Sequence, residues 1–113
     1  MRGVLEDKSF QFAIRIVRLS NYLRDEKKEF VISKQILRSG TSIGANIAEA
    51  QYAQSKTDFI TKMHISLKEA NETKYWLRLL CATNYIDDSQ TSIMDACDEL
   101  LRLLTSTCKT TKE

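Results

Sequence analysis

Apolar residues recur at helical spacing in four segments of the chain, and short polar stretches separate these segments. The pattern predicts helices at about 9–25, 33–53, 55–83 and 87–108. The chain has no proline and only three glycines, a composition that suits helices. Because the connections are short, consecutive helices are expected to run in opposite directions. We therefore expect one all-α domain over 1–113, an antiparallel up-down-up-down four-helix bundle.

Local signals add detail to three of these helices. Ser55 with Asp58, and Asp87 with Gln90, are capping pairs that are expected to start the third and fourth helices. In the second helix, Gly40 and Gly44 are four residues apart. Each glycine costs roughly 1 kcal/mol relative to alanine in a helix interior. We therefore expect another helix to approach closely there.

The first and third helices each carry two apolar stripes. On the first, one stripe consists of Phe10, Ala13, Ile14 and Val17, and the nearly opposite one consists of Phe12, Ile16, Leu19 and Leu23. A helix in a lone bundle needs only one buried stripe, and a large exposed apolar patch is a liability on a monomer. We expect a homo-oligomer whose interface uses Phe12, Ile16, Leu19, Leu23, Ile65, Trp76 and Leu79. The alternative is that a skewed bundle buries both stripes within one chain.

Charge is unevenly distributed along the chain. The net charge of +2 is too small to indicate a nucleic-acid-binding protein by itself. Residues 1–54 hold nine bases and six acids, whereas residues 87–99 hold five acids and no base. The first half offers a candidate basic face made of Arg15, Arg18, Lys27, Lys28, Lys34 and Arg38. The alternative is an ordinary surface of mixed charge.

The cysteines and the hydropathy indicate a cytoplasmic protein. The three cysteines have no Cys-x-x-Cys spacing, so neither a disulfide framework nor a zinc site is expected. The longest uncharged run is ten residues, 39–48, which is too short for a membrane span. Glu6 and Asp7 stand where a secretory signal would need apolar residues. We expect a cytoplasmic location and no membrane partner.

No arrangement of residues indicates catalysis. A di-iron bundle needs a Glu-x-x-His pair on two helices, but His64 is the one histidine and residue 61 is threonine. Glu69 and Glu72 lie one turn apart without a nucleophile or a phosphate loop. We expect these carboxylates to pair with Arg38 or with lysines across a subunit boundary. The sequence predicts no enzyme, no metal and no cofactor.

Two blocks of sequence carry a family resemblance, LRSGTSIGANIAEA at 37–50 and QSKTDFITKMHISLKEANETKYWLRLL at 54–80. They resemble the small bacterial "four helix bundle protein" family, whose members include proteins encoded in intervening sequences of large-subunit ribosomal RNA genes, also called S23 ribosomal proteins. The resemblance covers about 10–104. The polar motif residues that it identifies are Arg38, Ser42, Asn46, Glu49, Asp58, Glu69 and Glu72. Ala50 replaces a glycine typical of the family, so the second helix is expected to continue further here.

The resemblance implies a four-helix protomer and a ring-shaped homopentamer, and it does not imply an enzyme. Five copies would carry a net charge of about +10, which strengthens any basic stripe. One hypothesis for function is binding of structured RNA or another nucleic acid through the six basic residues, although the chain lacks the aromatic-rich platform of single-strand binders. The alternative is a scaffold for protein interaction, in which the acidic segment 87–99 docks a basic protein.

Overall fold

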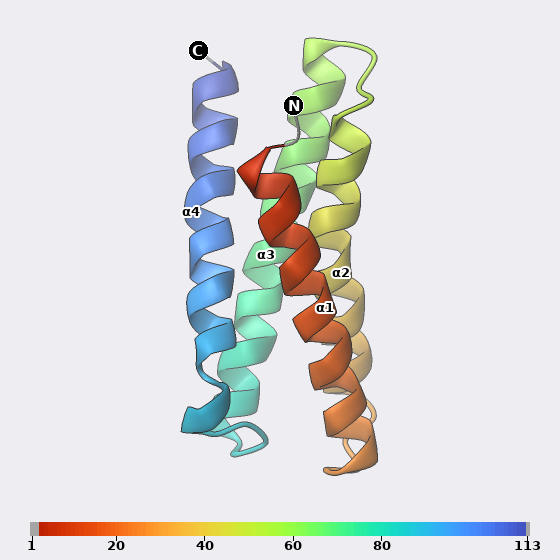
Figure 1. The fold of residues 1–113 in the computed structure, drawn as a ribbon, viewed down its shortest axis with the longest axis vertical. Helices are drawn as coiled ribbons and strands as arrows, with labels where there is room; N and C mark the ends of the chain where they lie inside the picture. The colour runs from red at the N-terminus through yellow and green to blue at the C-terminus, as the bar shows by residue number, and fades with distance from the viewer. Residues whose placement is uncertain (1–2, 113) are drawn as a thin grey trace.

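The computed structural model describes residues 3–112 and consists of four long helices in an antiparallel arrangement (Figure 1). The helices are α1 (Val4–Asp25), α2 (Ile32–Ala50), α3 (Lys56–Ala82) and α4 (Ser92–Lys112), and a short 3-10 helix, η1 (Asp88–Gln90), precedes α4. The chain passes down α1, up α2, down α3 and up α4, so both ends lie at the same end of the bundle. No β-strand occurs within residues 3–112. The predicted all-α four-helix fold is confirmed.

The four helices share one apolar core. Each helix packs against its neighbours in the chain, and α1 also packs against α4, though less extensively. Ile43 and Ile47 of α2, Leu77 of α3, and Leu100 and Leu104 of α4 are almost completely buried. Within residues 3–112, no helix is long and apolar enough to cross a membrane.

The core-facing stripe of α1 is the one that the sequence analysis assigned to a subunit contact. Phe12, Ile16, Leu19 and Leu23 are at most 7% exposed in the single chain. The predicted contact is therefore wrong for these four residues, since they cannot reach a second copy. Helical spacing shows that two stripes exist but does not show which one faces the bundle.

Small residues explain why α1 turns this way. Ser9 and Ser20 lie on the same face as the buried stripe, and both are 1% exposed. The Ser20 hydroxyl donates a hydrogen bond to the Ser33 carbonyl oxygen of α2 at 3.1 Å. The opposite stripe stays at the surface, where Phe10 is 64% and Val17 is 42% exposed. The chain therefore does carry an uncovered apolar stripe, but on the other side of α1.

The glycines of α2 mark the contact with α1, as expected. A Cβ atom on Gly40 would lie 2.8 Å from both Cγ atoms of Ile16. A Cβ atom on Gly44 would lie 3.3 Å from the Ser9 hydroxyl oxygen and 3.4 Å from the Ser9 carbonyl oxygen. The predicted close approach is confirmed, and α1 is the helix that makes it.

The N-terminus of α2 is capped by a residue that the sequence pattern did not single out. The Glu29 carboxylate accepts hydrogen bonds from the backbone N–H groups of Val31, Ile32 and Ser33, at 2.7–3.2 Å. The Ser33 hydroxyl donates to the Glu29 carbonyl oxygen at 2.8 Å. Glu29 is only 9% exposed. Its carboxylate accepts hydrogen bonds from N–H groups of the first turn, which have no acceptor within the helix.

Other helix ends differ from the predicted ones. α1 begins at Val4, five residues earlier than expected. α2 ends at Ala50 instead of continuing past it, because the next N–H groups, from Gln51 to Ala53, bond three residues back and form tight turns. The absence of a glycine at position 50 therefore does not extend α2.

The two predicted caps are both present, but one of them caps a different element. The Ser55 hydroxyl accepts from the Asp58 N–H at 3.0 Å and starts α3. Asp87 and Gln90 form a capping box around η1, and α4 begins only at Ser92. At the other end of α3, Asn84 adopts the left-handed conformation, with φ 65°, and the Tyr85 N–H bonds the Leu80 carbonyl oxygen at 2.9 Å.

Candidate functional site

The six basic residues of the candidate nucleic-acid surface do not form one face. Arg15 and Arg18 lie on α1 beside α4, Lys27 and Lys28 lie in the α1–α2 loop, and Lys34 and Arg38 lie on α2. Arg38 is turned toward α3, where it pairs with carboxylates. The structure therefore separates the α1 arginines from the basic residues of α2.

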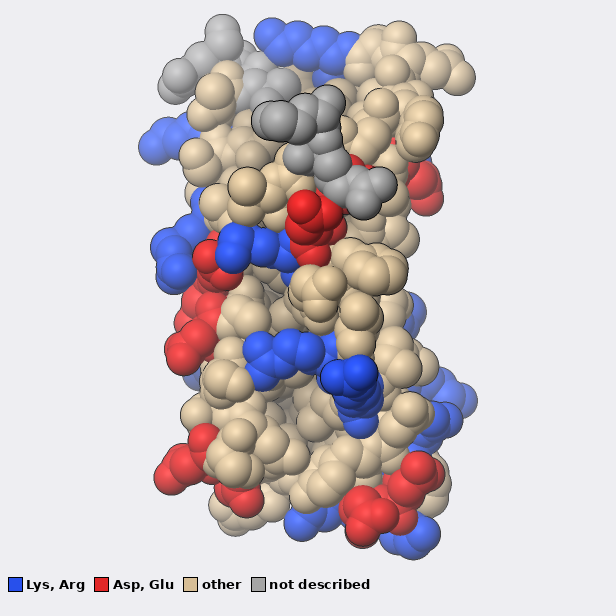
Figure 2. All heavy atoms as spheres, in the orientation of Figure 1, with Lys and Arg blue, Asp and Glu red and all other residues tan. Residues whose placement is uncertain are grey.

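Arg15 and Arg18 line a groove between α1 and the start of α4. The groove has a volume of about 350 Å³, and its polar lining residues are Arg15, Arg18, Tyr22, Ser89, Gln90 and Ser92. Figure 2 looks onto the face that α1 and α4 share and shows basic side chains near its centre, with acidic side chains above, below and beside them. Arg15 Nη2 donates a hydrogen bond to the Ser92 Oγ atom at 2.6 Å.

Carboxylates neutralise several other basic residues. Lys8 pairs with Glu99 at 3.2 Å, Lys62 with Glu49 at 2.8 Å, and Lys74 with Asp98 at 2.8 Å. Within residues 3–112, neither Arg15 nor Arg18 has an ion-pair partner. The same ion pairs also reduce the negative charge of the acidic segment 87–99.

Arg38 joins α2 to α3 through a cluster of polar side chains. Arg38 Nη1 lies 3.2 Å from Glu69 Oε1, and Arg38 Nη2 donates a hydrogen bond to Glu72 Oε2. The Trp76 indole N–H donates to the same Glu72 oxygen at 3.0 Å. The hydrogen bond from Arg38, with a smaller contribution from Trp76, lowers the pKa of Glu72, and the same contact with Glu72 raises the pKa of Arg38. The cluster braces two helices and leaves Arg38 less free to bind phosphate.

The remaining polar motif residues also make contacts within one chain. The Ser42 hydroxyl donates to the Arg38 carbonyl oxygen at 2.7 Å, and the Asn46 side-chain amide donates to the Ser42 carbonyl oxygen at 2.9 Å. Glu49 reaches Lys62 of α3, and Asp58 accepts from the Gln54 N–H at 3.1 Å. Glu69 and Glu72 thus pair with Arg38 of the same chain, which is one of the two kinds of partner expected for them.

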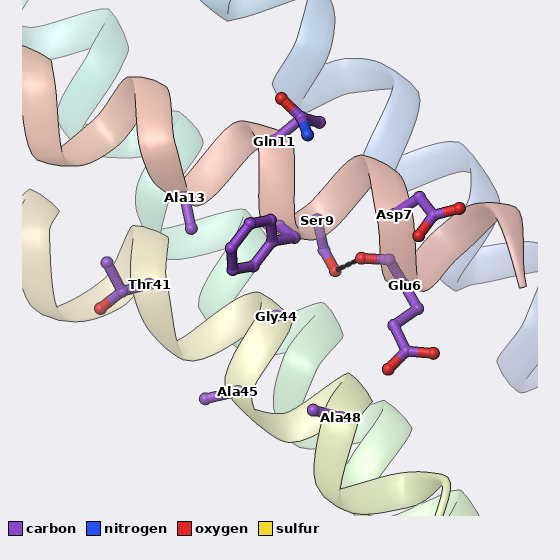
Figure 3. A pocket seen from close by; sticks show the side chains of 10 residues that line it. Glu6, Asp7, Ser9, Gln11, Ala13, Thr41, Gly44, Ala45 and Ala48 are labelled. Carbon is purple, nitrogen blue, oxygen red and sulfur yellow. Dashed lines mark hydrogen bonds between the residues drawn. The ribbon is translucent and has the colours of Figure 1, made fainter. Parts of the chain in front are cut away.

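A larger groove of about 720 Å³ lies between α1 and α2, on the outer side of α1. Its lining combines apolar and small residues, Phe10, Ala13, Thr41, Gly44, Ala45 and Ala48, with the polar residues Glu6, Asp7, Ser9 and Gln11 (Figure 3). The helical pattern indicated the α1 side of this groove, because Phe10, Ala13, Ile14 and Val17 form one apolar stripe. Gly44 and Ala48 of α2 are also four residues apart, but the pattern did not show that they would lie beside this stripe.

The expected contact residues of α3 differ from those of α1. Ile65, Trp76 and Leu79 are each partly exposed, so they remain available at the surface. Trp76 packs edge-on against Tyr75, with ring centroids 5.1 Å apart.

The Cys97 thiol is a poor candidate for chemistry. Cys97 is fully buried and donates a hydrogen bond from its S–H group to the Ala70 carbonyl oxygen at 3.6 Å. Burial raises the pKa of Cys97 to about 12, so the nucleophilic thiolate is scarce at neutral pH. Among the described residues, no three His, Cys, Asp or Glu side chains are grouped so that they could hold a metal ion.

Comparisons of the sequence and of the structure with known proteins lead to the same family. The family model of the 23S rRNA-intervening sequence protein matches residues 4–106. A crystal structure from Bacteroides thetaiotaomicron VPI-5482, of a protein with unknown function from the S23 ribosomal protein family, is 60% identical to this chain. It superposes with a TM-score of 0.92, and the match covers 94% of this chain and 99% of that one. No match was found among the curated proteins. The chain therefore belongs to the 23S rRNA-intervening sequence protein family.

Proposed function

We propose that the protein is a non-enzymatic, self-associating cytoplasmic protein that binds structured RNA through Arg15 and Arg18. The observation that carries this proposal is the pair of arginines in the α1–α4 groove without carboxylate partners. Uncompensated guanidinium groups attract phosphate and release counterions from it on binding. The family name, which refers to an intervening sequence of 23S ribosomal RNA, favours RNA as the source of that phosphate.

The proposal is tested by titrating a labelled structured RNA with the purified protein at about 50 and 200 mM salt. We expect binding that weakens steeply with salt, and a large loss of affinity in the Arg15→Glu/Arg18→Glu variant. The matched control is Arg78→Glu/Arg102→Glu, which makes the same charge change at two exposed arginines of α3 and α4. Equal affinities for the two double variants would contradict an RNA surface on α1.

Self-association is the second part of the proposal. The exposed stripe of Phe10 and Val17 beside the alanines of α2 supports it, because an apolar surface of this kind is usually covered by a partner. The family resemblance favours five copies in a ring. The α1–α2 groove replaces the Phe12 stripe as the proposed contact surface.

A protein scaffold that docks a basic partner on residues 87–99 receives less support. Asp98 and Glu99 already pair with lysines of the same chain, and Asp87 is engaged in capping η1. If the salt titration shows no RNA binding at the lower salt, this scaffold becomes the leading hypothesis.

A further inference from the structure

The groove between α1 and the start of α4 has the size of a site for one nucleotide. Its volume of about 350 Å³ is near the lower end of the range for small-ligand pockets, which is roughly 300–1,000 Å³. It opens where two helices pack less extensively than their neighbours do. A groove of this size suits a compact ligand better than a duplex.

The two arginines are arranged to hold a phosphate group. Arg15 spans the groove to the Ser92 hydroxyl, which fixes the guanidinium while using one of its five N–H donors. Because this partner is neutral, a phosphate would not have to displace a carboxylate. Arg18, one turn further along α1, is exposed and has no hydrogen-bond partner within residues 3–112.

The start of α4 adds to the positive potential of the groove. α4 begins at Ser92, so the positive end of its dipole lies in the groove lining. Asp87 and Asp88 are close in sequence, but neither lines the groove. The Asp87 carboxylate is turned back on η1, where its Oδ1 atom accepts from the N–H and the hydroxyl of Ser89.

An aromatic ring lies in the same lining. Tyr22 is one turn beyond Arg18 and is partly buried, and Lys27 Nζ lies 6.0 Å from its ring centroid. A flat ring beside a phosphate subsite suits an unpaired base, since every base has a face that can stack. A single ring accommodates one base, in keeping with the absence of a longer aromatic platform.

We infer that this groove binds one nucleotide, with its phosphate between Arg15 and Arg18 and its base against Tyr22. As a biological ligand, the nucleotide is an unpaired residue of a bound RNA, so this part rests on the proposed function. The site itself does not, because a free mononucleotide has the same phosphate and base.

The first test uses adenosine 5′-monophosphate as the probe and follows amide NMR signals of the full chain. We expect shifts confined to 15–22 and 89–93, with weaker effects from inorganic phosphate and none from adenosine, which lacks the phosphate. Arg18→Gln should weaken binding roughly tenfold, since a charge-assisted hydrogen bond is lost. Arg102→Gln is the matched control. Absent or scattered shifts, or an unchanged affinity in Arg18→Gln, would overturn the site.

The role of the ring is tested separately. Tyr22→Leu should reduce the preference for the mononucleotide over inorganic phosphate, and Tyr22→Phe should restore it. An unchanged preference in Tyr22→Leu would overturn the placement of the base.

Two RNAs of equal length then separate the pocket from the proposed function. A hairpin with an unpaired loop should bind more tightly than a blunt duplex, and Tyr22→Leu should remove the difference. Binding of both RNAs without any mononucleotide binding would overturn the pocket and leave the arginine surface intact. Mononucleotide binding without RNA binding would support the pocket and overturn the RNA function.

Discussion

Single positions in the bundle are set by contacts that cross from one helix to the next. Gly40 is the sharpest case, because the space for its missing Cβ is occupied by the branched, fully buried side chain of Ile16. The periodicity predicted a close approach at this position. It could not predict the partner, because that depends on how α1 is rotated about its own axis.

Gly40→Ala is expected to destabilise the protein although alanine is the better helix former. The gain in helix propensity is about 1 kcal/mol, whereas overpacking a core typically costs about 1–3 kcal/mol. Urea unfolding should therefore give a lower midpoint for Gly40→Ala than for Gly44→Ala, whose nearest contacts are looser. In an Ile16→Ala background, which lacks both Cγ atoms, Gly40→Ala should cost less stability than it does in the parent. A Gly40→Ala protein more stable than the parent would contradict the packing described.

Glu72 gives the stability of the protein a component that depends on pH. Its pKa is lowered from the ordinary value of 4.5 by the hydrogen bonds from Arg38 and Trp76, so the folded state binds its proton less readily than the unfolded state does. The stabilisation is complete above about pH 4.5 and is lost as the pH falls through the lowered pKa. It should stay below ~1 kcal/mol, because Arg38 is half exposed. Urea midpoints of the parent and of Glu72→Gln should differ at pH 7 and converge at low pH, and a constant difference would contradict this reading.

At the scale of elements, the sequence predicts that helices exist more securely than it predicts where they end or turn. The four helices follow from apolar spacing alone. Their ends depend on caps, and the Glu29 cap of α2 follows no familiar capping pattern. The Asp87–Gln90 box was visible in the sequence, but the 3-10 turn that it caps was not. The sequence did not show which stripe of α1 is buried. The small residues Ser9 and Ser20 mark the buried side, and this becomes clear only when α2 is packed against them.

Glu29→Ala should destabilise the start of α2. The substitution leaves up to three backbone donors without their acceptor, which should cost about 1–3 kcal/mol. Hydrogen exchange should show the largest loss of protection at Val31 to Ser33. Glu26→Ala, at an exposed position three residues earlier, should change stability by less than about 0.5 kcal/mol. If the two variants behave alike, the buried carboxylate is not the cap.

At the scale of the whole molecule, one side of the bundle is suited to a subunit contact and another to a ligand. The α1–α2 groove is lined by Phe10 and small residues and has two carboxylates, Glu6 and Asp7, in its lining, whereas the α1–α4 groove is basic and is lined by hydroxyl groups. The sequence predicted both kinds of surface. It could not show which basic residues share a surface. Arg15 and Arg38 both belong to the basic half of the chain but lie on different faces of the fold.

Val17→Lys and Ala45→Glu are expected to weaken self-association. Each places a charge on the exposed α1–α2 surface, where burial against a second copy would leave that charge without water. Light scattering should give the parent a mass several times the 13.0 kDa of one chain and give the variants a lower mass. Tyr52→Glu, at an 88% exposed position between α2 and α3, is the control and should keep the parent mass. A parent mass of one chain would contradict the proposed oligomer.

The rate at which the buried Cys97 thiol is chemically labelled can measure local opening of the bundle. A maleimide or disulfide reagent attacks the thiolate, and Cys97 is both enclosed between α3 and α4 and protonated at neutral pH. Labelling therefore requires that α4 first separate from α3, so its rate measures how often that seam opens. The α1–α4 groove lies at the start of the same helix. A bound nucleotide should therefore slow the labelling of Cys97 without contacting its sulfur atom.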